Sequence, residues 1–216
     1  MKFPKLIKAE FKERLNRFVG IIKLGQGAFS AYIRNTGRLK ELLFEGNTVY
    51  LSERSRGKHP FEIVLANFED KLVCIDSHIA PRLYAEFLKC PTLFEPKFED
   101  VRFDLLLGGR PVEVKSVNLV RLGTALFPDA PTTRGKKHIE KLIELSERGY
   151  SPLIVFVVQR EDAEVFSPNW EVDPAFSSAL LNYARLGLEI RAYRCSVDLR
   201  EIKLKEEIPV RLEALR

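Results

Sequence analysis

The first third of the chain alternates short apolar runs with glycine, proline and polar breaks. Five runs have the length and the β-branched or aromatic content of strands, and they span residues 17–24, 28–34, 48–54, 61–69 and 71–77. Between the second and third runs, the segment RLKELL predicts one or two helical turns. Five short strands in this space predict a small OB-like β-barrel, which we assign to residues 1–76.

The rest of the chain, residues 77–216, mixes helical and strand periods. Three helices are predicted, from Asp76 or Ser77 to about Cys90, from Thr132 or Thr133 to Arg148, and from Asp173 to Gly187. Strands are predicted over 102–107, 110–119, 124–129, 152–160, 188–195 and 201–212. The run PLIVFVVQR is almost continuously apolar, so both faces of that strand should be buried. This order predicts an α/β sandwich and a mixed α+β class for the whole chain.

One pair of predicted strands carries an unusual set of charges. The runs RFDLLL and RPVEVKSVNL flank Gly108-Gly109. A Gly-Gly pair between strand-like runs is typical of a tight hairpin turn, because both glycines readily adopt positive φ. The resulting register places Asp104 opposite Glu113, and Lys115 projects from the same face two residues further along. These three side chains should therefore converge.

Two carboxylates held this close repel each other unless a cation lies between them. A hard divalent ion such as Mg²⁺ is the first candidate, and Lys115 itself is the alternative. Such an ion polarises a phosphate and lowers the pKa of a bound water, while a lysine stabilises the developing charge. The same spacing also fits the wet face of an ordinary strand, although Val117 and Leu119 continue this face as apolar residues.

The net charge of +5 is unevenly distributed along the chain. Residues 1–80 carry 14 Lys and Arg against 9 Asp and Glu, whereas the remainder carries 21 of each kind. A basic module joined to a neutral one favours a nucleic-acid partner, and a surface that only confers solubility is the alternative. The candidate nucleic-acid contacts of the first domain are its basic loop residues, namely Arg34, Arg38, Arg54, Arg56 and Lys58.

Aromatic residues are interleaved with these cations, namely Phe29, Tyr32, Tyr50 and Phe61. Single-stranded nucleic acids are bound by such a mixture, because cations follow the phosphates and rings stack on the bases. Aromatic side chains of strands also build hydrophobic cores, so a structural role remains the alternative interpretation of the same residues.

A second basic cluster, Arg134, Lys137 and His138, lies at the start of the helix predicted after Pro131. Cations at this end oppose the helix dipole, which favours an external anion such as a phosphate, although a solvated helix face gives the same pattern. Gln159 ends the apolar strand, at the edge where α/β sheets place ligands.

Cysteine usage and hydropathy bear on the compartment. The 3 cysteines lack metal-type spacing and fit a reducing cytoplasm. No apolar run approaches the length of about 18 residues that a transmembrane helix needs, so no membrane partner is expected.

Several stretches of the sequence resemble the SfsA family, named for sugar fermentation stimulation. They are NTGRLKELL (35–43), FDLLL with VEVKSV, ALFPDAPTTRGKKHIEKL (125–142), VFVVQREDAEVFSP (155–168) and AYRC. The resemblance implies an N-terminal OB-like domain and a C-terminal domain similar to the PD-(D/E)XK nuclease fold. The family is described as DNA-binding, with transcriptional regulation as one suggested role.

Each residue of the nuclease motif can be matched to a position in this sequence. The resemblance implies Asp104 as its first acid and Glu113 and Lys115 as its (D/E)-x-K pair, with Mg²⁺ or Mn²⁺ as cofactor. Glu86 matches an acidic position on the preceding helix, which implies a further metal ligand. From the residues alone, a position at the edge of that helix is the favoured interpretation. Gln159 is a looser match to a polar residue on the next core strand. The residues directly before Asp104 are Arg102 and Phe103 rather than a proline, so the motif is degenerate here.

Two classes of function follow from these observations. The first is a nucleic-acid-binding protein, with DNA as the expected partner, whose metal-dependent centre cleaves phosphodiester bonds. The second is a non-catalytic DNA-binding transcriptional regulator that retains a nuclease-like fold. The complete set of Asp, Glu and Lys favours the first, and no nucleotide fingerprint or P-loop supports a sugar enzyme. Many nucleases of this fold act as dimers, so a homodimer stays open beside a monomer.

Overall fold

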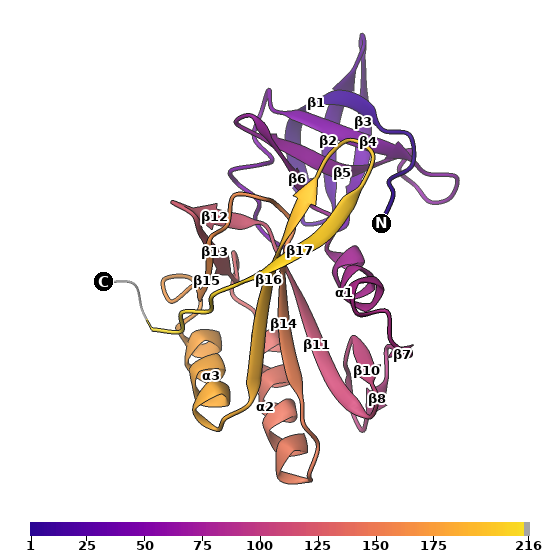
Figure 1. Cartoon of the computed structure of the whole chain (residues 1–216). Coiled ribbons are helices and arrows are strands. Elements are labelled where there is room, and N and C mark those ends of the chain that lie inside the picture. The colour runs from indigo at the N-terminus through magenta and orange to yellow at the C-terminus, as the bar shows by residue number, and fades with distance from the viewer. Residues whose placement is uncertain (214–216) are drawn as a thin grey trace.

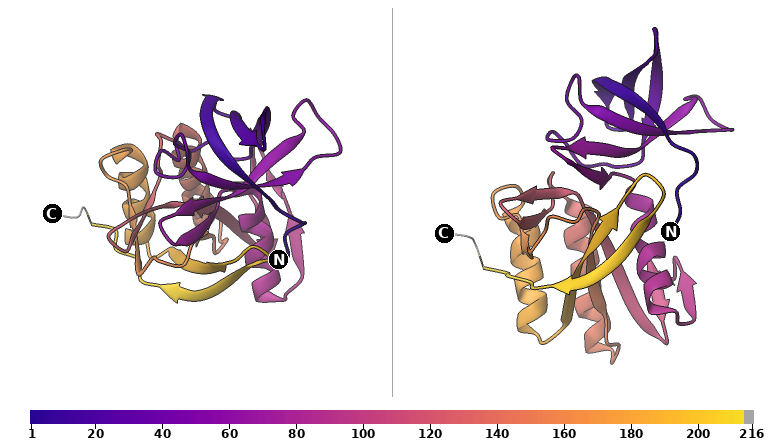
Figure 2. Two further views of the ribbon diagram at one scale, coloured as in Figure 1. Left: turned by 90° about the horizontal axis from the view of Figure 1, so that it is seen from above. Right: turned by 45° about the horizontal axis from the view of Figure 1, so that its top comes forward.

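The computed structural model describes residues 1–213 and consists of a β-barrel above an α/β sandwich (Figures 1 and 2). The barrel strands follow the order β3-β2-β1-β4-β5-β6, and a parallel pairing of β3 with β5 closes the barrel. The strands are β1 (Ile7–Asn16), β2 (Val19–Leu24), β3 (Gly27–Ile33), β4 (Thr48–Glu53), β5 (Phe61–Phe68) and β6 (Lys71–Cys74). The OB-like barrel is therefore confirmed.

Strand β1 lies in the basic N-terminal segment, where the hydrophobic pattern predicts no strand. Its inward-facing positions include Ala9 and Phe11, whereas Lys8, Glu10 and Lys12 alternate with them. Because few positions of this strand are buried, its charged outer face masks the period of two. The segment RLKELL forms a single turn, in which the amide of residue 43 donates to the carbonyl of residue 39 at 2.8 Å.

A second sheet forms the centre of the sandwich and has the strand order β17-β16-β14-β11-β10-β7. Its strands are β7 (Thr92–Phe94), β10 (Leu105–Leu107), β11 (Arg110–Val117), β14 (Leu153–Val158), β16 (Glu189–Val197) and β17 (Ile202–Ile208). Strands β11, β14 and β16 run parallel, and antiparallel neighbours flank them on both sides. A short two-stranded ribbon, β8 (Lys97–Phe98) with β9 (Val101–Arg102), lies beside the hairpin.

Helices cover both faces of this sheet (Figure 1). They are α1 (Ala80–Leu88), preceded by the 3₁₀ turn η1 (Ser77–Ile79), α2 (Thr133–Glu147) and α3 (Pro174–Arg185). Along β14, Phe156 and Val158 pack in the same core cluster as α2 and α3, whereas Val155 and Val157 pack with α1 and the barrel strand β5. Both faces of this strand are buried, as its apolar run predicts.

Strands β12 (Leu119–Arg121), β13 (Thr124–Phe127) and β15 (Val165–Pro168) form a separate small sheet. The sequence predicts the 124–129 segment as a third strand continuing the hairpin, and that pairing within the main sheet is wrong. Asn118 separates β11 from β12. Its side-chain amide donates to the Cys74 carbonyl of the barrel at 2.6 Å. The chain therefore leaves the main sheet at this point, and β14 takes the neighbouring position beside β11.

The barrel and the sandwich share a buried polar seam. The Asn35 amide donates to the Asn118 side chain and to the Ile75 carbonyl, both at 2.9 Å. The first residues of the chain also reach the sandwich, where the Met1 amino group donates to the Ile202 carbonyl at 2.8 Å. No helix within residues 1–213 is long and apolar enough to cross a membrane.

Candidate functional site

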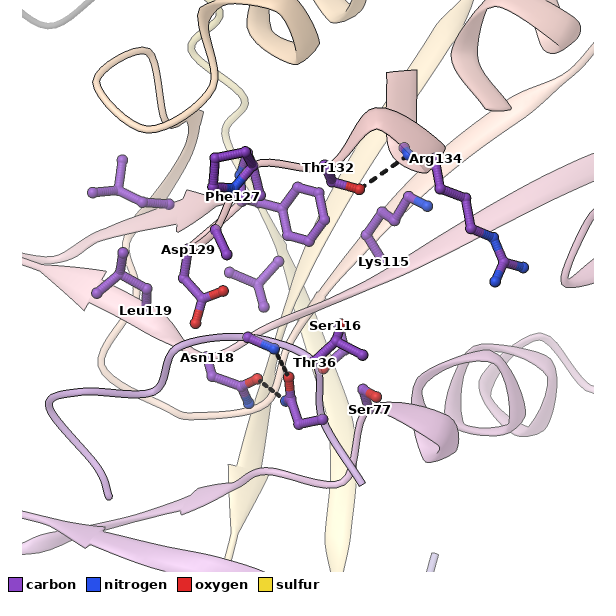
Figure 3. Close-up of a pocket in the computed structure, with 18 of the residues that line it drawn as sticks. Thr36, Ser77, Lys115, Ser116, Asn118, Leu119, Phe127, Asp129, Thr132 and Arg134 are labelled. Atoms are coloured by element: carbon purple, nitrogen blue, oxygen red, sulfur yellow. Dashed lines mark hydrogen bonds between the residues drawn. The ribbon is translucent and has the colours of Figure 1, made fainter. Parts of the chain in front are cut away.

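A cleft of about 580 Å³ lies between the barrel and the sandwich (Figure 3). One wall comes from β11 and from the loop that leads into α2, and the other comes from the barrel loop at residues 35–37 and from Arg17. Asp104, Glu113 and Lys115 all line this cleft. In Figure 3, Lys115 lies beside Thr132 and the start of α2. The structure thus brings the predicted catalytic residues together.

The hairpin that carries these residues has the predicted register. Leu105 pairs with Val112, and Gly108 and Gly109 form the turn with φ of 55° and 86°. Asp104 lies one residue before β10, and its Oδ2 accepts a hydrogen bond from the Val114 amide at 2.7 Å. This bond fixes the aspartate against the neighbouring strand.

Glu113 lies at the floor of the cleft and is only 4% exposed. Its Oε1 accepts a hydrogen bond from Lys115 Nζ at 2.5 Å and lies 2.7 Å from His138 Nδ1. Its Oε2 is buried and has no hydrogen-bond partner. An unpaired buried carboxylate oxygen is costly, so this atom is a position where a ligand would be stabilising.

The surroundings push the two acids towards different charge states. Burial, reinforced by the charge of Glu113, raises the pKa of Asp104 to about 7. Burial also opposes the ionisation of Glu113, but Lys115 and His138 outweigh it and hold the pKa of Glu113 below its ordinary value. Near neutral pH Glu113 is therefore ionised and Asp104 is only partly protonated, and a cation would displace the remaining proton.

This donor set fits a hard divalent cation. Both acids supply carboxylate oxygens, and one of these oxygens is buried and unpaired. No cluster of three or more His, Cys, Asp or Glu side chains is arranged to hold a metal anywhere in residues 1–213. Mg²⁺ suits a site of two carboxylates, because it commonly retains waters and takes further oxygens from a phosphate.

The structure does not bring Glu86 to this site, so its prediction as a metal ligand is wrong. The Glu86 side chain is 63% exposed and lies 3.6 Å from the Met1 amino group. Helix α1 packs on the sheet through Leu83 and Tyr84, which leaves Glu86 exposed at the edge of the helix. The alternative of an edge position is the correct one.

The basic residues of α2 separate into different roles. Arg134 is exposed and lines the cleft, and its Nε donates to His138 Nε2 at 3.3 Å. Both ring nitrogens of His138 therefore have partners inside the protein, where the ring supports Glu113. The contact of His138 with a phosphate stays a prediction. Lys137 is exposed outside the cleft, where it pairs with Asp100 at 3.4 Å.

The predicted basic residues of the barrel do not line the cleft. Arg34 pairs with Glu62 at 2.9 Å, and Arg54 lies 3.7 Å from the same carboxylate and stacks over the Tyr32 ring at 4.7 Å. The remaining three, Arg38, Arg56 and Lys58, are exposed on the barrel surface. The cleft receives a different cation, Arg17, which the sequence analysis places at the start of a predicted strand and does not single out as a nucleic-acid contact. In the structure Arg17 lies in the turn between β1 and β2.

Gln159 acts behind the cleft. Its Nε2 donates to the Asp76 carbonyl at 2.9 Å, and its Oε1 accepts a hydrogen bond from the Ser116 hydroxyl. Ser116 lines the cleft, so Gln159 supports the cleft wall from the seam between the two domains.

Asp129 is a further residue of the site that the sequence pattern does not single out. It lines the cleft, and its Oδ2 accepts a hydrogen bond from the Leu39 amide of the barrel at 3.1 Å. A Cβ at Gly37 would lie 2.5 Å from the Asp129 carboxylate, so any larger residue there would have to displace this side chain. The signal is present in the motifs NTGR and FPDAP, but nothing in the sequence shows that these segments meet.

Comparisons with known proteins agree with this architecture. Residues 13–75 match the family model described as the SfsA N-terminal OB domain, and residues 77–201 match the sugar fermentation stimulation protein RE domain. A sugar fermentation stimulation protein homolog from Aquifex aeolicus is 49% identical over 95% of this chain and 98% of its own length. One from Desulforamulus reducens is 40% identical over 97% of this chain and 94% of its own length.

A solved structure is similar over the whole described fold. The SfsA protein of Pyrococcus furiosus, solved in complex with Ca²⁺, superimposes with a TM-score of 0.90 at 29% identity and covers 98% of each chain. Both domains are matched by family models, and the curated relatives are matched over nearly their full length. The chain therefore belongs to the sugar fermentation stimulation protein family.

Proposed function

We propose that this protein binds nucleic acid, with DNA as the expected partner, and hydrolyses its phosphodiester bonds with a divalent ion held by Asp104 and Glu113. The observation that carries the proposal is the unpaired, buried Oε2 of Glu113 in a cleft that also holds Asp104 and Lys115. A relative solved with Ca²⁺ supports the same interpretation, since Ca²⁺ and Mg²⁺ both take oxygen ligands.

Each residue of the site has a separate task in this proposal. When bound, the ion polarises the phosphate and favours deprotonation of an attacking water. Lys115 Nζ, fixed by Glu113 at 2.5 Å, stabilises negative charge that develops on the phosphate. The Val114 amide and His138 hold the two carboxylates in place. Preorganised contacts of this kind avoid reorganisation during the reaction.

Cationic side chains around the cleft bind the phosphates of the nucleic acid. Arg134 lines the sandwich wall and Arg17 lines the barrel wall, so a strand that enters the cleft passes between two positive side chains. The basic residues on the outer barrel surface add attraction that does not depend on sequence.

Cleavage of labelled single- and double-stranded DNA and RNA tests the proposal. We expect cleavage with Mg²⁺ or Mn²⁺ and none with EDTA. The variants Asp104→Ala and Lys115→Ala should each lose about 100-fold or more in rate, as is typical when a transition-state contact is removed. Glu86→Ala is the matched control, because this acid lies outside the cleft, and its rate should be unchanged.

The non-catalytic regulator makes a different prediction for the same experiment. Tight, salt-sensitive binding without cleavage by any metal would exclude the hydrolytic centre and leave a DNA-binding protein with a nuclease-like fold. Cleavage that persists in Asp104→Ala would exclude this cleft as its source.

A further inference from the structure

We propose that the substrate is single-stranded and that its strand runs from the carboxylate pair, across the barrel loop at residues 35–38, to a base-stacking platform at Phe18. This inference rests on the proposed function for the phosphate end of the path. The stacking platform and the clamped loop carry it independently of turnover.

The shape of the cleft limits what can reach its floor. Glu113 is nearly inaccessible, and the cleft has walls from both domains and a volume of about 580 Å³. Volumes of about 300–1,000 Å³ enclose small molecules, which is the scale of one or a few nucleotides. A base-paired duplex is too wide to enter such a space. A single strand can place one phosphate at the floor and leave between the two walls.

The barrel wall is a rigid surface. The Arg14 guanidinium donates to the carbonyl oxygens of Gly37 at 2.7 Å, Arg38 at 2.6 Å and Arg17 at 2.7 Å. One cation therefore fixes two separate loops, the β1–β2 turn and the loop at residues 35–38. Asp129 holds the second loop from the other side through the Leu39 amide.

This clamping presents Thr36 to the cleft (Figure 3). The Asn35 side chain caps the loop by accepting the Gly37 amide at 2.8 Å, so the apex residue between them is held in one orientation. A preorganised wall loses little conformational entropy when a strand is laid along it.

Phe18 follows directly after Arg17 and has the properties of a stacking platform. Its ring is 43% exposed, and it stacks on the Tyr32 ring at a centroid distance of 6.4 Å and an interplanar angle of 22°. Arg54 lies over the Tyr32 ring at 4.7 Å. The Phe18 carbonyl accepts the Ile33 amide at 2.8 Å, so the backbone beneath the ring is fixed.

An aromatic ring beside a cation fits an unpaired nucleobase next to its phosphate. Arg17 lies in the cleft wall and Phe18 is its neighbour, so the two can contact a phosphate and a base of the same strand. Stacking tolerates every base, because each has a π-face, whereas bases within a duplex are already stacked on each other. The occupant expected here is therefore single-stranded nucleic acid without strong sequence preference.

Equilibrium binding in EDTA tests this inference apart from cleavage. The probe is a fluorescein-labelled oligothymidylate of about 12 nucleotides, within the site size of one OB barrel, and the competitor is a duplex of the same length. We expect the single strand to bind at least about 10-fold more tightly than the duplex. Phe18→Ala should weaken single-strand binding by about 5- to 100-fold, and Phe18→Trp should restore it.

Phe44→Ala is the matched control, because Phe44 is a barrel phenylalanine of similar exposure, 51%, whose sequence neighbours do not line the cleft, unlike the Arg17 that precedes Phe18. Its affinity should equal that of the unmodified protein. Equal affinity for duplex and single strand, or an unchanged affinity in Phe18→Ala, would overturn the inference even if the protein cleaves DNA. Conversely, binding that depends on Phe18 without any metal-dependent cleavage would retain the inference for this platform and reject the nuclease.

Discussion

Asp104 and Glu113 are both acidic residues beside the same cleft, but their surroundings give them different charges near neutral pH. Glu113 receives Lys115 and His138, which stabilise its carboxylate, whereas Asp104 receives one backbone amide and the repulsion of Glu113. Without an ion, ionised Asp104 destabilises the fold. A divalent cation would reverse this effect, because it stabilises both negative charges.

Asp104→Asn tests this electrostatic account through stability. The folded-state pKa of about 7 lies above the ordinary value, so the folded state binds the proton more tightly than the unfolded chain. The contribution of Asp104 to stability is fully present below its unfolded pKa and is lost as pH rises through about 7. Asparagine stays neutral, so the variant should melt at a higher temperature than the unmodified protein at alkaline pH in EDTA.

The advantage of the variant should grow from about pH 4 to pH 7 and then level off, at about 2–4 °C for each kcal/mol gained. Thermal unfolding followed by circular dichroism measures this difference. Excess Mn²⁺ provides the control, because it should stabilise the unmodified protein more than the variant. A difference in melting temperature that does not vary with pH would contradict the assigned charge state.

At the scale of single residues, the sequence predicts well that Asp104 and Glu113 lie opposite each other, because turn type and register are local properties. The Gly108-Gly109 turn determines which residues oppose each other, so the pairing of Asp104 with Glu113 follows from the order of residues alone. The contact of Glu113 with His138, by contrast, cannot be predicted from the order of residues. His138 is 25 positions away along the chain, and only the packing of α2 on the sheet shows that its ring supports the carboxylate.

At the scale of secondary-structure elements, the start of α2 forms part of the sandwich wall of the cleft. Its N-cap Thr132 accepts the Gly135 amide at 3.0 Å, and Asp173 accepts the Thr132 amide at 2.7 Å while also capping α3. The two helices therefore begin from one shared carboxylate. This arrangement holds the first turn of α2 against the cleft and directs His138 towards β11.

His138→Ala should weaken metal binding without unfolding the protein. Loss of a residue that orients a metal-binding carboxylate commonly lowers affinity by about 10- to 100-fold. Isothermal titration with Ca²⁺ measures the change. Glu140→Ala is the control, because Glu140 is exposed on the same helix, and it should bind Ca²⁺ like the unmodified protein. An unchanged affinity in His138→Ala would mean that the histidine only fills space.

The hydrophobic pattern of the sequence predicts where helices and strands occur better than it predicts which strands pair with each other. The caps at Thr132 and Asp173 are local signals, and all three predicted helices form. The pattern also predicts strand β13, but the sheet that this strand joins depends on where Asn118 bonds to the barrel, which is a long-range contact. Strand β1 is not predicted, because few of its positions are buried and apolar and most of the others are charged.

At the scale of the whole molecule, the candidate catalytic carboxylates and the excess of positive charge lie on different domains. The carboxylates belong to the neutral sandwich, and the excess of positive charge belongs to the barrel. The cleft lies at their junction, where the polar seam of Asn35 and Asn118 holds the two domains together. No local pattern in the sequence indicates this junction, because each of its two sides appears in a separate motif.

Arg17→Ala tests the contribution of the barrel wall. If Arg17 contacts one phosphate, its removal should lower the slope of log Kd against log salt concentration by about 0.7 for a single strand. Arg185→Ala is the control, because this exposed arginine lies on α3 away from the cleft. Fluorescence anisotropy at several salt concentrations gives both slopes. Identical slopes for Arg17→Ala and the unmodified protein would remove Arg17 from the binding path.

The most direct measurement is the position of a bound ion. Crystals soaked in Mn²⁺ and measured near the manganese absorption edge give an anomalous peak wherever the ion binds. We expect one peak in the cleft, at about 2.0–2.3 Å from an oxygen of Asp104 and from Oε2 of Glu113, within the usual range for carboxylate ligands of hard cations. A peak only at other sites, or no peak in the cleft at saturating Mn²⁺, would contradict a metal centre at this pair.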